Sequence, residues 1–355
     1  METEATNNNE GGYQVSILFS PFTIRGMTLK NRIMMSPMGT VAADEHGCLS
    51  EWQFIHYGAR AVGQAGLIII EVTAVEERGA DPGSLGLWND SQMDKLSELI
   101  RIIKRQGAKV GVQLGHAGRK KETGLGLSSS GLPFRGRRTE ALNVAGILEI
   151  VKAFGRAAYR AKQAGVDVIE LHAAHGYLIN DFLSPLTNVR EDHYGGSHEN
   201  RYRFLGEIID SVREVWEGPL FVRVSANEYE EGGNGIEDHL IFASYMKKQG
   251  VDLIDASSGG VTDRKPEVFP GYQVRYAQAI RQQGQLPTAA VGLITTGKQA
   301  EDILREGSAD LIAVGRALMR DPYWPRTAAE QLGETIPEPN SYRGLWFPRG
   351  YTEGG

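Results

Sequence analysis

The chain has little cysteine and no long apolar run. Cys48 is its single cysteine in 355 residues, which excludes an internal disulfide, a four-cysteine zinc site and a cysteine-ligated iron–sulfur cluster. Apolar runs such as residues 67–70 fall far short of the ~18 residues of a membrane span. The N-terminal segment METEATNNNEGG is acidic and amide-rich and lacks the apolar core of a secretory signal. We therefore predict a soluble cytoplasmic protein with no membrane partner and with a disordered tail over residues 1–12.

Basic charge is also not in excess. The chain carries 38 Lys and Arg against 44 Asp and Glu, a formal net charge of −6, which argues against nucleic acid as a partner. Glycine, in contrast, is abundant: there are 44 glycines, well above the usual ~7%. This favours a fold with many tight turns and with backbone that approaches a ligand closely.

Eight short apolar runs recur along the chain, and amphipathic stretches separate them. The runs do not alternate in polarity, as expected of parallel strands that are buried on both faces. The predicted strands are 32–37, 66–75, 109–114, 166–172, 220–225, 251–257, 287–292 and 310–315. The clearest predicted helices are 93–106, 147–163, 200–216 and 239–249. Eight such alternations predict a closed (β/α)₈ TIM barrel, of class α/β, as a single domain over residues 13–335. The alternative is an open doubly wound sheet, which needs no particular count of eight.

Two connections are longer than a barrel requires. Residues 119–140 hold six basic side chains among glycine and serine, and long loops of this kind are either functional lids or mobile segments. A contact with a cofactor phosphate and a solvated mobile loop are both open for this segment. Residues 184–197 form the second connection, and Ser197 is the predicted N-cap of the helix that follows. Residues 336–355 are predicted to be a C-terminal tail, which could lie at a subunit interface.

The turns after the seventh and eighth strands favour a phosphate. Barrels frequently bind phosphate there through backbone N–H groups and helix N-termini. Gly292 and Gly315 would let the backbone approach an anion, and Arg316 would add a cation whose geometry suits phosphate oxygens. The alternative is two ordinary turns beside a surface arginine.

The turn after the fourth strand holds His172, His175 and Tyr177. Two imidazoles that converge there could bind a metal or could donate hydrogen bonds to one oxygen. A metal site would need a third ligand, and no HExxH motif or cysteine partner is present. We therefore expect no metal and favour a hydrogen-bonding pair with an adjacent phenol as proton donor. Two buried structural histidines are the alternative.

Arg223 lies in the middle of a buried strand, where packing alone does not explain a guanidinium. Its partner could be a ligand that gains negative charge, or a carboxylate inside the barrel, for which Glu71 and Glu170 are the candidates.

Several stretches together resemble the old yellow enzyme family of flavin-dependent ene-reductases. The similarity runs from Leu18 to about Leu332, and it is most specific in three motifs: HAAHGYL (172–178), YGGSHENRYRF (194–204) and GRALMRDP (315–322). The chain is most similar to the short bacterial-type branch, which has His-x-x-His. The matching stretches are LKNRIMMSPM (29–38), VGVQLGHAGRK (110–120), VIELHAAHGYLINDFLSPLTNVR (168–190), FVRVSA (221–226), AVGLIT (290–295) and AVGRALMRDP (313–322).

The resemblance implies FMN as the bound cofactor and NADPH or NADH as the hydride donor. In that family arrangement, His172 and His175 would bind the substrate oxygen and Tyr177 would donate the proton. Arg223 would lie near the N1–C2 oxygen region of the flavin, and Gln113 would bond its pyrimidine edge. The residues implied to contact FMN are Pro37, Met38, Gly39, Gln113, Arg223, Gly292, Gly315 and Arg316.

The implied reaction is the reduction of the activated C=C bond of α,β-unsaturated carbonyl or nitro compounds. The nicotinamide cofactor would reduce the flavin, and hydride would then pass from flavin N5 to the β-carbon of the substrate. Two other functions stay open. A pathway-specific flavoenzyme of the same family could catalyse desaturation or double-bond isomerisation, and the barrel with its phosphate turns would also fit a phosphosugar lyase or isomerase.

The chain departs from the family where it usually has a cysteine that tunes the flavin and a tyrosine that lines the substrate pocket. Gly39 and Val41 stand at these positions, so the flavin potential and the pocket would differ. In related enzymes an arginine near the C-terminus reaches a neighbouring subunit's site, and Arg343 is its nearest match. We therefore expect a homodimer or homotetramer.

Overall fold

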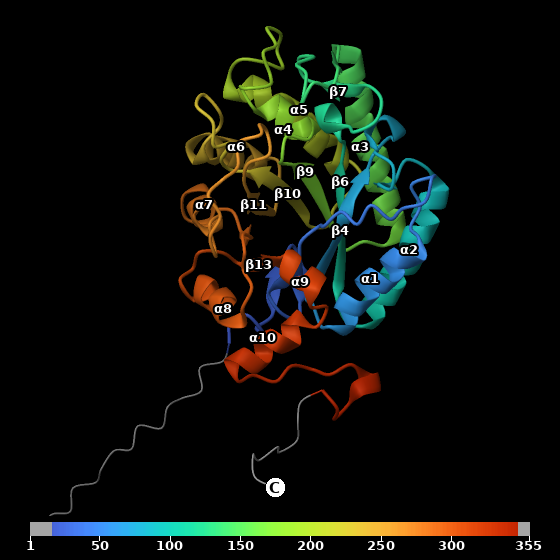
Figure 1. Ribbon diagram of the computed structural model, residues 1–355, viewed down its shortest axis with the longest axis vertical. Helices are drawn as coiled ribbons and strands as arrows, with labels where there is room; N and C mark the ends of the chain where they lie inside the picture. The colour runs from blue at the N-terminus through green and yellow to red at the C-terminus, as the bar shows by residue number, and fades with distance from the viewer. Residues whose placement is uncertain (1–15, 347–355) are drawn as a thin grey trace, which may run out of the picture.

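The computed structural model describes residues 16–346, and its centre is a closed barrel of eight parallel strands (Figure 1). The ring closes because β3 pairs with both β13 and β4. Its strands are β3 (Ile33–Met35), β4 (Leu67–Ala74), β6 (Lys109–Gly115), β9 (Val168–Ala173), β10 (Leu220–Ser225), β11 (Leu253–Ser257), β12 (Thr288–Ala290) and β13 (Leu311–Val314). The predicted TIM barrel is confirmed, and the open sheet is excluded. Most strands are shorter than their apolar runs, because pairing ends where the chain turns into a loop.

One end of the barrel is filled by apolar side chains and plugged by a hairpin. Strands β1 (Phe22–Ile24) and β2 (Met27–Leu29) pair antiparallel. Their Ile24, Met27 and Leu29 pack into one cluster with Met34, Leu67 and other strand residues that start the parallel ring. A second, larger cluster joins the outward faces of the strands to the helices. The polar site must therefore lie at the other end of the barrel, where the strands finish.

Helices surround the strands (Figure 1). They are α1 (Glu51–Val62), α2 (Asp90–Arg105), α3 (Val144–Ala164), α4 (Leu178–Leu183), α5 (His198–Arg213), α6 (Ile236–Lys248), α7 (Val274–Ala279), α8 (Gly297–Arg305), α9 (Arg316–Arg320) and α10 (Trp324–Leu332). The four helices predicted from periodicity are all present, with ends shifted by a few residues. Ser197 accepts a hydrogen bond from the Asn200 N–H and is the N-cap of α5, as predicted. Gly165 ends α3 with φ of 88°, a conformation that a side chain would disfavour.

Shorter elements lie in the connections. They are η1 (Glu77–Gly79), β5 (Leu85–Gly86), η2 (Gly118–Lys120), β7 (Gly126–Ser128), β8 (Thr139–Ala141), η3 (Ile280–Gly284) and η4 (Asn340–Tyr342). The long connection 119–140 thus contains a two-stranded sheet, β7 with β8. It packs against α4 at the end of the barrel where the strands finish. The part of this loop that follows η2 is therefore built into the fold and is not only a solvated segment.

Both ends of the described chain are attached to the barrel. The Glu301 carboxylate on α8 accepts hydrogen bonds from the backbone N–H groups of Ile17 and Leu18 and from the Ser16 hydroxyl, at 2.8–3.0 Å. Near the other end, the Trp346 ring packs edge-on against Tyr323. The predicted tail 1–12 lies outside the described residues, and so do residues 347–355 of the predicted C-terminal tail. Among residues 16–346, no helix has the length and apolarity to cross a membrane.

Candidate active site

The three residues predicted after the fourth strand come together. The ring centroids of His172 and His175 are 5.3 Å apart with an interplanar angle of 85°, and the Tyr177 ring lies 4.7 Å from His172. His172 is the penultimate residue of β9, whereas His175 and Tyr177 lie in the turn before α4. His175 has φ of 59°, a conformation that costs energy in a residue with a side chain. This backbone conformation reverses the direction of the chain and places the second imidazole beside the first.

Hydrogen bonds orient both imidazoles. The Ala174 N–H donates to His172 Nδ1 at 3.3 Å, so the proton of the neutral ring is on Nε2. The ring nitrogen Nε2 of His175 is 2.7 Å from Ser257 Oγ, on β11. The backbone N–H of His175 donates to Ser225 Oγ, on β10. Burial lowers the pKa of both histidines well below the ordinary value, and neighbouring cations lower it further. Both rings are therefore neutral near pH 7 and can each donate one N–H.

Tyr177 remains protonated in the same environment. Burial raises the pKa of its phenol, and the carboxylates of Asp81 and Glu122 raise it further. Lys120, from the long loop, has its ammonium 5.5 Å from the centre of the Tyr177 ring and donates to the carbonyl of His175 at 2.6 Å. The phenol is thus available as a neutral proton donor beside the imidazoles.

A cavity lies next to these residues, at the ends of β10 to β13. Five of the predicted cofactor residues line it together: Met38, Arg223, Gly292, Gly315 and Arg316. Ser257, the partner of His175, lines it as well. The turns after the seventh and eighth strands therefore form one cavity, as the prediction of a phosphate site requires.

The other three predicted cofactor residues are not among those that line this cavity. Pro37 and Gly39 flank Met38 in the chain, directly after β3. Gln113 on β6 is buried and donates to Glu170 Oε1 at 2.8 Å.

The cavity has features that suit a polar cofactor. The Ser36 hydroxyl lines it and is buried without a hydrogen-bond partner among the described residues, which is costly unless a ligand supplies one. A Cβ on Gly315 would lie only 3.0 Å from the Met38 sulfur. Glycine at this position therefore lets Met38 pack closely against the backbone, which a side chain here would prevent. These observations fit a bound flavin phosphate and ring system.

Arg223 has a partner that the sequence argument did not name. Its Nε lies 3.2 Å from Asp255 Oδ2, and the two residues are register neighbours on β10 and β11. The prediction of Glu71 or Glu170 as the ion-pair partner was wrong. The sequence does contain a feature that indicates Asp255. It is a charged residue within the otherwise apolar strand Leu253–Ser257, just as Arg223 is a charged residue within the apolar strand Leu220–Ser225. Burial raises the pKa of Asp255 and of nearby Glu170, while Arg223 opposes the rise.

Glu71 instead fastens the segment that follows β3. Its carboxylate accepts from the Thr40 N–H at 2.6 Å and from the Thr40 hydroxyl at 2.7 Å. Tyr57 on α1 donates to the same carboxylate. A Cβ placed on Gly39 would point toward Glu71 Oε2, 4.0 Å away, with nothing nearer. Val41 is 75% exposed and has φ of 52°, so neither Gly39 nor Val41 fills the space that a cysteine and a tyrosine would occupy.

Arg343 lies away from the histidines, whereas Gln273 lines the cavity. Arg343 lies exposed just after η4, and no contact described for residues 16–346 joins it to the histidines of its own chain. Gln273, which was not predicted from the sequence, lines the cavity, and its Oε1 lies 3.4 Å from Ser257 Oγ. It lies in the loop after β11, where no periodic pattern marks it.

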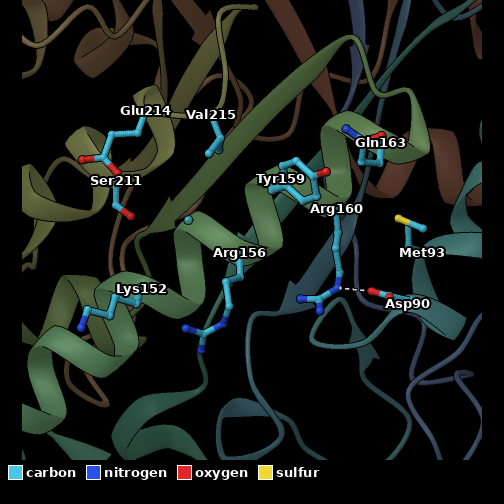
Figure 2. A pocket seen from close by; sticks show the side chains of 11 residues that line it. Asp90, Met93, Lys152, Arg156, Tyr159, Arg160, Gln163, Ser211, Glu214 and Val215 are labelled. Carbon is cyan, nitrogen blue, oxygen red and sulfur yellow. Dashed lines mark hydrogen bonds and ion pairs between the residues drawn. The ribbon is translucent and has the colours of Figure 1, made fainter.

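A larger hollow lies elsewhere and lacks this chemistry. A groove lined by residues of α2, α3 and the end of α5 has a volume of about 810 Å³, against about 150 Å³ for the cavity at the strand ends. Figure 2 shows the side chains that line this groove. Arg160 crosses it to Asp90 at 2.9 Å. The groove is open to solvent and holds none of the strand-end residues, so size alone does not identify the site. Within residues 16–346, no group of three His, Cys, Asp or Glu side chains could hold a metal ion.

Comparison with known proteins agrees with this geometry. The model of the NADH:flavin oxidoreductase / NADH oxidase family matches residues 17–335. The chain belongs to this family. It is 54% identical over 336 residues to an NADPH dehydrogenase of Geobacillus sp. (strain WCH70), covering 93% of this chain and 99% of the relative. It is 52% identical over 334 residues to an NADPH dehydrogenase of Bacillus subtilis (strain 168), with 93% and 99% covered.

The family is also evident among solved structures. Morphinone reductase superposes with a TM-score of 0.78 at 27% identity, covering 93% of each chain. An old yellow enzyme homologue from Zymomonas mobilis superposes with a TM-score of 0.76 at 25% identity, covering 94% of this chain and 97% of that one. The predicted old yellow enzyme family, its barrel and its class of flavin-dependent NAD(P)H oxidoreductase are therefore confirmed.

Proposed function

We propose that the protein is an FMN-dependent ene-reductase that reduces the C=C bond of α,β-unsaturated carbonyl or nitro compounds with electrons from NADPH or NADH. The observation that carries this proposal is the pair of neutral imidazoles beside the Tyr177 phenol, next to a cavity that Arg223 lines. Such a set suits a small substrate that gains negative charge on one oxygen and a proton on a nearby carbon. The family name alone does not specify this substrate class.

FMN would occupy the cavity at the strand ends. Arg316 and the backbone at Gly292 and Gly315 would hold its phosphate, and Met38 would pack against the ring. Arg223 would face the pyrimidine end of the ring, while its ion pair with Asp255 holds the guanidinium in place. Pro37, Gly39 and Gln113 complete the proposed contacts. When bound, the flavin supplies the hydride that the protein's own side chains cannot.

The residues of the chain then control the charge and the proton. His172 Nε2–H and His175 Nδ1–H would bind the substrate oxygen and stabilise the negative charge that develops on it, with Ser257 donating its hydroxyl proton to His175 Nε2. Donors that already face such charge are worth roughly 10²–10³ in rate each in other enzymes. Tyr177 would give its proton to the α-carbon, and its raised pKa keeps that proton in place until the substrate carbon becomes basic.

Both half-reactions can be followed in one anaerobic spectrum. We expect the purified protein to show flavin absorption that bleaches with NADPH and returns when cyclohexenone or a maleimide is added. If the bands bleach but no enone restores them, the electron acceptor is of another class. If no flavin is present and added FMN does not bind, the assignment of the cavity is wrong.

The imidazole pair has its own test. A His172→Ala/His175→Ala variant is expected to keep bound flavin and to be reduced by NADPH at the wild-type rate, but to lose enone binding. Flavin content and enone titration of the oxidised enzyme measure the two effects separately. A variant that binds enones as well as the wild type would contradict the role given to the histidines.

A second function is favoured by the segment after β3. Because Gly39 has no side chain and Val41 is exposed, the site has room for a larger, pathway-specific substrate, and desaturation or double-bond isomerisation would use the same residues. Redox-neutral turnover without added nicotinamide would identify isomerisation, and turnover without nicotinamide that depends on an added electron acceptor such as O₂ would identify desaturation. We also propose a homodimer or homotetramer in which Arg343 reaches a neighbouring site. Light scattering on the purified protein, with Arg343→Ala as a variant, tests that proposal.

A further inference from the structure

The tip of the long loop forms a tight turn that carries an arginine in an unfavourable conformation. Phe134 and Arg137 pair across the turn, and the two residues between them, Arg135 and Gly136, have φ of 49° and 75°. Two successive positive φ values define a turn in which asparagine, aspartate or glycine is preferred at the first position. An arginine at this position costs conformational energy. We therefore look for a role of the Arg135 side chain that offsets this cost.

This turn contacts a second loop at the end of the barrel where the strands finish. Arg135 Nε donates to Asp263 Oδ1 at 2.6 Å, and Asp263 belongs to the loop after β11. Beside it, Arg119 donates to the carbonyl of Val261, in the same loop, at 2.9 Å. The segment 134–138, which we call the strap, therefore joins the loop after β6 to the loop after β11.

The strap leads outward from the proposed proton donor. The Lys120 ammonium is 5.5 Å from the centroid of the Tyr177 ring and 5.2 Å from that of the Phe134 ring. The Arg135 guanidinium is also 5.2 Å from the centroid of the Phe134 ring. Arg119 adds a third cation, 4.9 Å from Phe134. A molecule that binds at Tyr177 and extends toward solvent on this side would meet Lys120 first and the strap next.

The positive charge of this region is not fully compensated by the protein. Arg119 faces the buried Asp181 at 3.8 Å, and Arg135 faces Asp263 with more than half of each side chain exposed. Lys120 forms no ion pair among residues 16–346. Burial lowers its pKa, and the Asp263 carboxylate opposes this from a greater distance. The strap adds the exposed Arg138. Like charges held together destabilise the fold unless an anion binds among them.

We propose that the strap binds the 2′-phosphate of NADPH, with Arg135 and Arg138 as the residues that distinguish NADPH from NADH. This inference rests on the proposed function and adds to it that the nicotinamide binds beside Tyr177 while the rest of the dinucleotide extends out of the site. Lys120 lies between the two ends, where the pyrophosphate would pass. Arg135 exchanges its exposed carboxylate partner for the phosphate, to which a guanidinium binds in a two-pronged geometry.

Arg135→Ala and Arg135→Glu test the proposal, with both nicotinamides as electron donors. We expect Arg135→Ala to raise KM for NADPH about tenfold and Arg135→Glu to raise it further, while KM for NADH and kcat stay near the wild-type values. Arg138→Ala should act in the same direction. KM for NADPH in the wild type should rise with ionic strength. Arg101→Ala, an exposed arginine on α2, is the matched control and should change neither KM.

Three results would overturn the assignment. They are an equal change in KM for NADPH and NADH, no change in either, and a change confined to KM for an anionic enone such as a carboxylate-bearing substrate. Photoreduced enzyme mixed with cyclohexenone separates this proposal from the function itself. If the reduced flavin is reoxidised by the enone but the Arg135 variants keep the wild-type preference for NADPH, only the strap assignment fails. If the enone does not reoxidise it, the proposed function fails.

Discussion

His175 Nε2 and Ser257 Oγ lie 2.7 Å apart, although 82 residues separate them in the chain. Ser257 ends β11, and its hydroxyl oxygen also lies 3.4 Å from Gln273 Oε1. The serine therefore joins the substrate side of the site to the cavity proposed for the flavin. It fixes the ring of a histidine whose backbone conformation is itself unfavourable, so that the second imidazole faces the first.

We predict that Ser257→Ala weakens enone binding about fivefold, because a hydrogen bond of this kind is worth roughly 1 kcal/mol. His172, which has its own hydrogen bond from Ala174, should keep its orientation. Titration of the oxidised flavoenzyme with an enone measures the change, and flavin content serves as the control. An unchanged affinity would mean that His175 is oriented by the turn alone.

Tyr177→Phe should slow the reoxidation of the reduced enzyme by cyclohexenone by about 10²-fold, since general acids typically contribute 10²–10⁴ in rate. The phenol is predicted to act only on the substrate, so reduction by NADPH should keep its wild-type rate. Stopped-flow absorbance under anaerobic conditions separates the two steps. Equal rates in both steps for variant and wild type would assign the proton to solvent.

Gly315→Val should release the flavin. A Cβ at this position would already lie 3.0 Å from the Met38 sulfur, and the larger side chain would enter the cavity. Gly58→Ala on α1 is the matched control, because nothing lies within 4 Å of its added Cβ and alanine stabilises a helix by about 1 kcal/mol over glycine. Flavin content after gel filtration should fall in the first variant and stay complete in the second.

Gly39→Cys should leave the free energy of unfolding within about 0.5 kcal/mol of the wild type, as expected for a substitution with space around it. The Cβ would lie 4.0 Å from Glu71 Oε2, and Gly39 has no positive φ. The new thiol would stand where the family usually has its cysteine, so we expect the reduction potential of the bound flavin to change. Spectroelectrochemical titration of both proteins measures it, and identical potentials would show that this position does not contact the flavin.

Glu301→Ala should destabilise the protein by roughly 2–3 kcal/mol, because hydrogen bonds to a buried carboxylate are of the charge-assisted kind. Burial alone would raise the pKa of Glu301, but the hydrogen bonds from Ile17, Leu18 and Ser16 outweigh it and hold the pKa below its ordinary value. A lowered carboxyl pKa gives stability that is present above the unfolded value and is lost as the pH falls through the folded value.

The pH dependence is the control for this prediction. Urea denaturation at a series of pH values should show the difference between Glu301→Ala and wild type at full size near neutral pH and shrinking below about pH 4.5, the region of the unfolded carboxyl pKa. A difference that does not depend on pH would mean that the loss is one of packing and not of the charged hydrogen bonds.

Local sequence features were enough to predict the barrel and much of the site. Eight apolar runs predicted eight strands, and Ser197 and Gly165 mark helix ends where the structure has them. His172, His175 and Tyr177 lie within six residues, so one turn brings them together whatever the rest of the chain does. The strand-end glycines and Arg316 follow from the rule that parallel strands in a barrel finish at one end.

The remaining relationships depend on closure of the barrel. Arg223 meets Asp255 because β10 and β11 pair in a register that aligns the two charges, and the sequence alone offered Glu71 and Glu170 equally well. Ser257 reaches His175, and Arg135 reaches Asp263, across distances of 82 and 128 residues. Local sequence patterns determine the hydrophobic period of each element and the position of the turns. Which side chains contact each other between different strands and loops depends on strand register and on the direction in which each loop leaves its strand. The sequence by itself thus determined the architecture and the reacting groups, and only the tertiary structure decided which side chains orient them.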